Sequence, residues 1–209
     1  MKKTKEEERR MRGHRWIATG SFALAVLAAV PASAQSPHPA DRWEFAVEAG
    51  YLAKVKNNSP HDYRIAPLQV AWRSPSMTDL WRSAEGARLT LRNRVALVAE
   101  AIVRGPEDHY FAVSGAPVFE LWAPDRRTAG FFEIGGGVGF INSQGVPGGQ
   151  GQDLAFNWYT QGGLRRQLRD DFALTAALYF THHSNLGMTN PNPGIDVLGV
   201  NFGAVWSFK

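Results

Sequence analysis

A period-two alternation of apolar and polar residues runs through most of the chain after residue 40, and it constrains the fold more than any other feature. Because successive side chains of a strand point to opposite faces, this period predicts β-strands. Eight such segments lie near residues 43–51, 65–73, 88–104, 109–122, 130–141, 154–166, 171–184 and 195–208. Most reach the length of about 9–11 residues that a tilted strand needs to cross a bilayer.

The two faces of these segments differ sharply, because one is almost wholly apolar and the other carries charges of both signs. The charged positions are Glu44, Glu48, Arg92, Arg94, Glu100, Arg104, Glu120, Glu133 and Arg165. A soluble β-sandwich would bury the apolar face, whereas an eight-stranded membrane barrel would turn it to lipid and fill its narrow interior with paired charges. We favour the all-β, eight-stranded antiparallel transmembrane β-barrel. Aromatic residues near the segment ends fit the two membrane interfaces, and these are Trp43, Tyr51, Trp72, Tyr110, Trp122 and Trp206.

A basic stretch followed by a short apolar run opens the chain. Residues 2–15 carry seven Lys or Arg, and the apolar run extends from Trp16 to Val30, before an Ala-Ser-Ala sequence ending at Ala34. This pattern predicts a secretory signal peptide over residues 1–34, cleaved after Ala34. An uncleaved membrane anchor is the alternative, although the apolar run is shorter than the roughly 20 residues of a spanning helix.

The leader accounts for the net charge of the chain. Its seven Lys or Arg and three Glu give 7 − 3 = +4, and the whole chain is also +4, so residues 35–209 are formally neutral. The charge therefore offers no support for nucleic-acid binding, and no nucleic-acid partner is expected. The chain has no cysteine, which excludes thiol nucleophiles and Cys-ligated zinc. We expect one domain, the barrel, over residues 35–209.

Three polar residues, His182, Ser184 and Asp196, interrupt the apolar face of the last two segments. That face otherwise carries Phe172, Leu174, Ala176, Leu178 and Phe180, and then Leu198, Val200, Phe202, Ala204, Trp206 and Phe208. An even strand count places both termini on the periplasmic side and the connection 185–194 at the cell surface. The three residues are then expected on the lipid-facing wall at the level of the outer leaflet. Ionisable groups that face lipid are costly and usually functional.

The spacing of these residues suits ester hydrolysis. His182 and Ser184 are two residues apart on one strand, so they point the same way about 6.6 Å apart. Asp196 on the neighbouring strand is expected to orient His182, which completes the nucleophile, base and acid of a serine hydrolase. Such a site also needs donors for the oxyanion, and the candidates are the backbone amides of Asn185 and Gly187 and the side chain of Asn192.

The stretch His182-His183-Ser184-Asn185, followed by Asn190-Pro191-Asn192-Pro193-Gly194-Ile195-Asp196, resembles the signature of the outer-membrane lipid A 3-O-deacylases, the PagL family. The resemblance implies an eight-stranded barrel of the Gram-negative outer membrane that hydrolyses the ester-linked acyl chain at position 3 of lipid A. Lipopolysaccharide and outer-membrane lipids would be its partners, no cofactor or metal is implied, and a homodimer stays open. It assigns the family's His, Ser and loop Asn to His182, Ser184 and Asn192. The family's acidic residue, typically Glu, falls on Asp196, whose side chain is one methylene shorter.

Other residues support chemistry less well. His183 has the opposite parity and is expected to be structural, facing the barrel interior. The glycines at 135–137 lack a phosphate-loop lysine and indicate close packing. Asp62, Asp108 and Asp153 lie in expected surface loops without metal-ligand spacing. The main alternative function is a non-catalytic small barrel with a structural or adhesive role, and the alternative fold is a soluble periplasmic β-protein.

Overall fold

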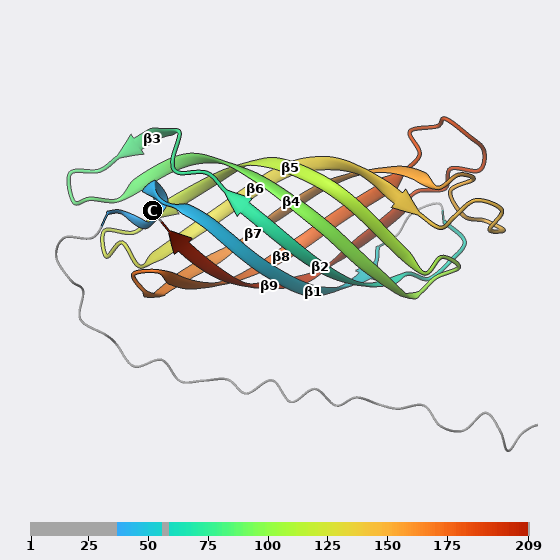
Figure 1. The fold of residues 1–209 in the computed structure, drawn as a ribbon, viewed down its shortest axis with the longest axis horizontal. Helices are drawn as coiled ribbons and strands as arrows, with labels where there is room; N and C mark the ends of the chain where they lie inside the picture. The colour runs from blue at the N-terminus through green and yellow to red at the C-terminus, as the bar shows by residue number, and fades with distance from the viewer. Residues whose placement is uncertain (1–36, 56–58, 209) are drawn as a thin grey trace, which may run out of the picture.

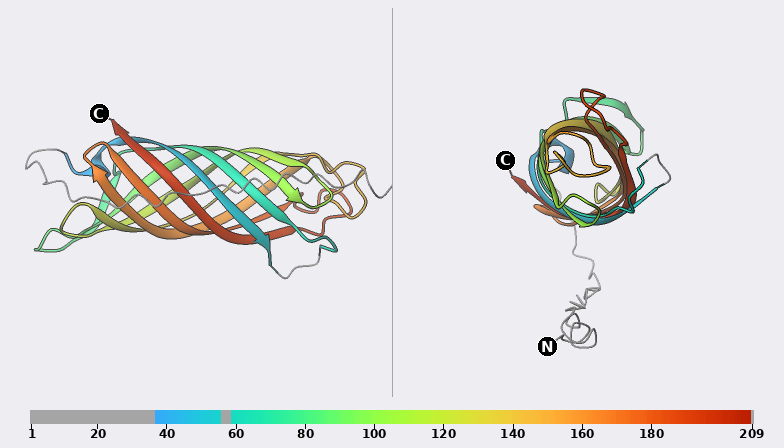
Figure 2. Two further views of the ribbon diagram at one scale, coloured as in Figure 1. Left: turned by 90° about the horizontal axis from the view of Figure 1, so that it is seen from below. Right: turned by 90° about the vertical axis from the view of Figure 1, so that its right-hand side faces the viewer.

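The alternating segments form strands that close into a barrel. The computed structural model describes residues 37–55 and 59–208, so the predicted leader, 1–34, lies outside the described residues. The barrel strands are β1 (Trp43–Lys54), β2 (Arg64–Arg73), β4 (Arg88–Arg104), β5 (His109–Trp122), β6 (Thr128–Ile141), β7 (Leu154–Arg169), β8 (Phe172–Ser184) and β9 (Ile195–Phe208). Consecutive barrel strands pair antiparallel, and pairing of β1 with β9 and of β2 with β4 closes the ring, which Figure 2 shows end-on. The predicted eight-stranded antiparallel barrel is confirmed.

One short strand was missed by the sequence pattern. Strand β3 (Thr78–Arg82) pairs with β4 in the connection between β2 and β4, outside the closed ring (Figure 1). All five of its residues are exposed, so it has no buried face to produce an apolar alternation. It extends β4 at the end of the barrel where Trp43 pairs with Phe208 and both described termini lie.

The barrel is inside-out compared with a soluble protein. Leu164, Leu178 and Phe140 are 64–65% exposed on its outer wall, whereas Arg92 and Glu44 are 0% exposed in its interior. Burying charges while exposing large apolar side chains is favourable only where the exposed face meets lipid. This pattern decides between the two folds left open by the alternation, in favour of the membrane barrel.

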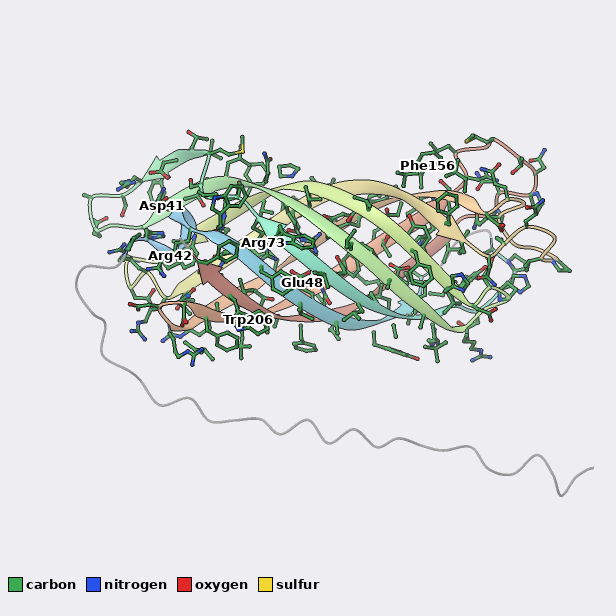
Figure 3. All side chains as sticks on the ribbon, viewed as in Figure 1. Asp41, Arg42, Glu48, Arg73, Phe156 and Trp206 are labelled. Carbon is green, nitrogen blue, oxygen red and sulfur yellow. The ribbon has the colours of Figure 1, made fainter. Side chains whose placement is uncertain are left out.

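Ion pairs fill the interior. Arg94 joins several of these partners, because its Nη2 donates to Glu48 at 2.9 Å and to Gln69 at 2.7 Å while Nη1 donates to the Tyr159 hydroxyl at 3.0 Å. Glu48 and Arg73, both labelled in Figure 3, are buried in the interior and pair at 2.7 Å. A second group nearer the termini joins Arg92 and Arg165 to Glu44 and Glu120. A buried charge that lost its partner would cost several kcal/mol. These ion pairs therefore favour the observed arrangement of strands over any arrangement that separates the partners.

Three residues do not lie where the sequence led us to expect them. Tyr110 and Trp122 are fully buried, so neither belongs to the interfacial aromatic girdles, whereas Trp43, Tyr51, Trp72 and Trp206 are exposed on the outer wall. The Tyr110 hydroxyl donates to Asn157 and the Trp122 ring nitrogen to Glu120, which satisfies both polar atoms inside. Arg104 was expected inside, but its side chain is 67% exposed. A register shift where β2 pairs with the end of β4 turns it outward.

The loops that follow β1, β4, β6 and β8 gather at the end of the barrel opposite the termini (Figure 1). Glu107 is buried among them, accepting hydrogen bonds from the Tyr63 hydroxyl at 2.9 Å and the Ser143 hydroxyl at 2.7 Å. Burial, with the Glu107 carboxylate beside it, raises the pKa of Tyr63. These contacts pack the loops over this end of the barrel.

Within residues 37–55 and 59–208, no helix is both long and apolar enough to cross a membrane.

Candidate active site

The two final strands bring His182 and Asp196 face to face. They are direct register partners across β8 and β9, and His182 Nδ1 lies 2.5 Å from Asp196 Oδ1. Their side chains are 27% and 22% exposed, so the pair is shielded on most sides but open to the outer wall. A charge-assisted contact this short fixes the ring orientation and leaves Nε2 as the nitrogen free for proton transfer.

Ser184 is the least exposed of the three residues. It is 8% exposed at the last position of β8, and its register partner on β7 is Phe156, which lies beside the loop end in Figure 3. Ser184 shares strand parity with His182, as predicted. Among the described residues no hydrogen bond links the two side chains, and hydrogen bonds of catalytic groups often tighten only when substrate is bound.

Two residues that the sequence pattern did not identify hold the His182 ring. Trp158 is its register partner on β7, and the ring centroids are 6.1 Å apart. On the other side lies Gly194, whose φ of +71° favours glycine and whose Cβ, if present, would lie 3.1 Å from His182 Cε1. For Gly194, a glycine directly after an Asn-Pro-Asn-Pro run was the sequence signal for a special backbone position. The contact of Trp158 with His182 had no such signal, because it depends on the register between β7 and β8.

The loop 185–194 is built around the Asn185 side chain. Its Nδ2 donates to Gln150 O at 2.5 Å and to Thr189 O at 2.9 Å, and its Oδ1 accepts the Gly187 N–H at 2.8 Å. The Gly187 amide is therefore engaged within the loop rather than directed at a substrate. The Asn185 N–H is engaged as well, because it donates to Asn192 Oδ1 at 3.0 Å, and this bond positions the half-buried side-chain amide of Asn192.

His183 points to the interior, as its parity predicted. It is 1% exposed, its Nε2 lies 2.9 Å from Glu100 Oε2, and its ring contacts the Tyr110 ring edge-on. Gly135 is equally structural, because a Cβ there would lie 2.2 Å from the Gly115 carbonyl oxygen. No group of three or more potential metal ligands occurs among the described residues.

An eight-stranded barrel with an apolar outer wall and a charged interior belongs to the class of outer-membrane β-barrel proteins, and in this one His182 and Asp196 pair on the outer wall. The family model of PagL, lipid A 3-O-deacylase, matches residues 61–205. The chain belongs to the PagL family, and it is a lipid A 3-O-deacylase of the outer membrane.

The fold is shared with a solved structure. The crystal structure of the outer membrane enzyme PagL superposes with a TM-score of 0.51 at 20% identity, covering 77% of this chain and 97% of that chain. The Yersinia pestis outer membrane protein Ail gives a TM-score of 0.38 at 16% identity, covering 79% of this chain and 99% of that one. A comparison with curated protein sequences gave no significant match.

Proposed function

We propose that Ser184, His182 and Asp196 perform the deacylation as nucleophile, general base and orienting acid. The observation that carries the proposal is the 2.5 Å contact between His182 Nδ1 and Asp196 Oδ1, on the wall that faces lipid. An imidazole held by a carboxylate in this way keeps the tautomer that accepts a proton at Nε2 and is stabilised once it becomes an imidazolium.

The reaction proceeds in two steps. Ser184 Oγ attacks the carbonyl carbon of the 3-position ester and passes its proton to His182 Nε2, which gives a tetrahedral oxyanion. Collapse breaks the bond to the sugar oxygen, which takes the proton from His182 and leaves as the free 3-hydroxyl. A water molecule, deprotonated by His182, then attacks the acyl-enzyme and releases the fatty acid.

The side-chain amide of Asn192 is the proposed oxyanion donor. Asn185 serves as the centre of the loop, and its backbone N–H holds Asn192 in place at 3.0 Å. The Gly187 amide supports this arrangement through its bond to Asn185. Removing one oxyanion donor typically lowers kcat by about 10²- to 10³-fold, and we expect that loss for Asn192→Ala.

Mass spectrometry of lipid A from cells that express each variant tests the proposal. Wild type should remove one hydroxy-acyl mass from lipid A, and Ser184→Ala or His182→Ala should leave it intact. Thr160→Ala is the matched control, because Thr160 has a lipid-facing hydroxyl on β7, which donates to the Glu133 carbonyl oxygen at 3.0 Å. Unchanged deacylation by Ser184→Ala would favour a non-catalytic role for these residues.

The leader and the assembly state are further parts of the proposal. Cleavage after Ala34 predicts that the mature protein begins at Gln35, which N-terminal sequencing of outer-membrane material would establish. A homodimer stays a prediction that light scattering in detergent tests.

A further inference from the structure

We propose that Arg64 and Arg104 form a binding site for a phosphate group of the lipid A sugar backbone. The inference rests on the proposed function, since it concerns the substrate of that site. It begins from the one charged residue that the alternation placed on the wrong face, Arg104.

Arg64 and Arg104 place two like charges directly opposite one another. They are register partners on β2 and β4, next to the shift that separates Arg64 from the regular pairing of Ile65 with Ile102. Like charges across a strand pair are destabilising. A pair of this kind is tolerated where an anion compensates it.

One carboxylate compensates only half of this charge. Asp62 Oδ1 lies 3.1 Å from Arg64 Nη1, and Asp62 Oδ2 lies 2.9 Å from Arg104 Nη1. The group of three therefore keeps a net charge of +1. The Arg64 and Arg104 side chains are 33% and 67% exposed, so both guanidinium groups remain accessible to a ligand.

The site shares the outer wall with the candidate catalytic residues. Ala53 on β1 pairs with Arg64 on one side and with Leu198 on the other, and Leu198 is two residues from Asp196. Strands about 4.8 Å apart and a rise of about 3.3 Å per residue put Arg64 about 12 Å from Asp196 along the wall. That separation excludes a contact with the scissile ester itself. It suits a group carried on a more distant part of the sugar backbone.

Positive charge at this end of the barrel is concentrated on one side. The loops 105–108, 142–153 and 185–194 contain no Lys or Arg. The described cations near this end are Lys54, Arg64 and Arg104, and the Lys54 ammonium already donates to Ser59 O at 2.6 Å and His61 O at 2.7 Å. When the ester of a phosphorylated glucosamine disaccharide lies at Ser184, the available positive groups for its phosphate are therefore Arg64 on β2 and Arg104 on β4. Guanidinium groups match phosphate oxygens in charge and geometry.

Kinetics with two substrates test this site. Purified protein in detergent micelles is given bisphosphorylated lipid A and lipid A that lacks the phosphate on the sugar remote from the scissile ester. The double variant Arg64→Gln/Arg104→Gln should raise the apparent KM for the first substrate about tenfold, with kcat retained, and leave the second unchanged. Arg166→Gln is the matched control, because Arg166 is an exposed arginine at the opposite end that also pairs with an aspartate, Asp125, at 3.1 Å.

Replacing Asp62, which pairs with both arginines, should change the KM in the opposite direction. Asp62→Asn removes the competing carboxylate and should lower the apparent KM for the bisphosphorylated substrate, with the effect shrinking at high salt. An unchanged KM in the double variant, or an equal loss on both substrates, overturns the phosphate site. Weaker binding by Asp62→Asn, reproduced in wild type by a chelator, would also overturn it, in favour of a bridging divalent cation. If Ser184→Ala kept full activity, the proposed function would fail instead, so the two failures are distinguishable.

Discussion

Replacing Asp196 with alanine should slow the deacylase by about 10³-fold without unfolding it. Asp196 Oδ1 lies 2.5 Å from His182 Nδ1, and both side chains are mostly shielded. With about 4 Å between the centres of charge and an effective permittivity of about 20, the carboxylate stabilises the imidazolium by about 4 kcal/mol. At 1.36 kcal/mol per factor of ten, this corresponds to about 10³ in rate.

The loss should appear in kcat rather than in KM. His182 becomes cationic only as it takes the proton of Ser184, so the interaction strengthens in the transition state. Asp196→Glu should retain part of the activity. Its extra methylene, about 1.5 Å long, must fold back to meet a ring that Gly194 and Trp158 hold in place. We expect roughly a tenfold loss, the cost of about 1.4 kcal/mol of misalignment.

The assay is release of the hydroxy fatty acid from lipid A by protein folded in detergent micelles, followed by mass spectrometry. Heat-modifiable migration of each variant on gels serves as the folding control. The barrel should still fold, because neither His182 nor Asp196 bonds to Arg94 in the interior network. An Asp196→Ala protein within threefold of wild type, folded by that criterion, would remove Asp196 from the mechanism.

Three further predictions follow from single contacts. Gly194→Ala forces a side chain into a φ of +71° and against His182 Cε1 at 3.1 Å, so kcat should fall at least tenfold while the barrel stays folded, and unchanged kinetics would contradict the positioning role. Arg94→Met removes a guanidinium partner from buried carboxylates on β1 and β6 and should destabilise the barrel by about 3–5 kcal/mol in urea unfolding; a loss below about 1 kcal/mol would contradict this. Burial, with Arg88 nearby, lowers the pKa of His38 to about 4. The unfolded chain therefore binds more protons than the folded one between pH 6.5 and 4, so stability should fall as the pH drops through that window; an NMR titration midpoint near 6.5 would refute it.

Much of the fold and the direction of the candidate site residues could be predicted because both follow from a local rule. Side chains alternate along a strand whatever the partner strand is. His182 and Ser184 therefore share the lipid-facing parity, and His183 faces inward, before any pairing is known. The misplacement of Tyr110 and Trp122 came from setting that rule aside for aromatic residues near strand ends, because both share parity with the inward Glu120.

The remaining features depend on pairing and competition among hydrogen bonds. The direction of Arg104 required a register shift that the alternation does not encode, and β3 has no buried face to produce a pattern. The sequence offered the Gly187 amide as an oxyanion donor, but in the folded loop its N–H donates a hydrogen bond to Asn185 Oδ1.

The sequence by itself determined strands with one apolar and one charged face, and it placed His182, Ser184 and Asp196 on the apolar one, because strand periodicity and side-chain polarity are properties of each segment alone. The tertiary structure decided which partners those residues meet. Only register between β8 and β9 brings Asp196 to His182, only the packed loop engages the Asn185 and Gly187 amides, and only the shift at the end of β4 turns Arg104 outward. Each of these depends on contacts between segments far apart in the chain, which alternation within one strand does not specify.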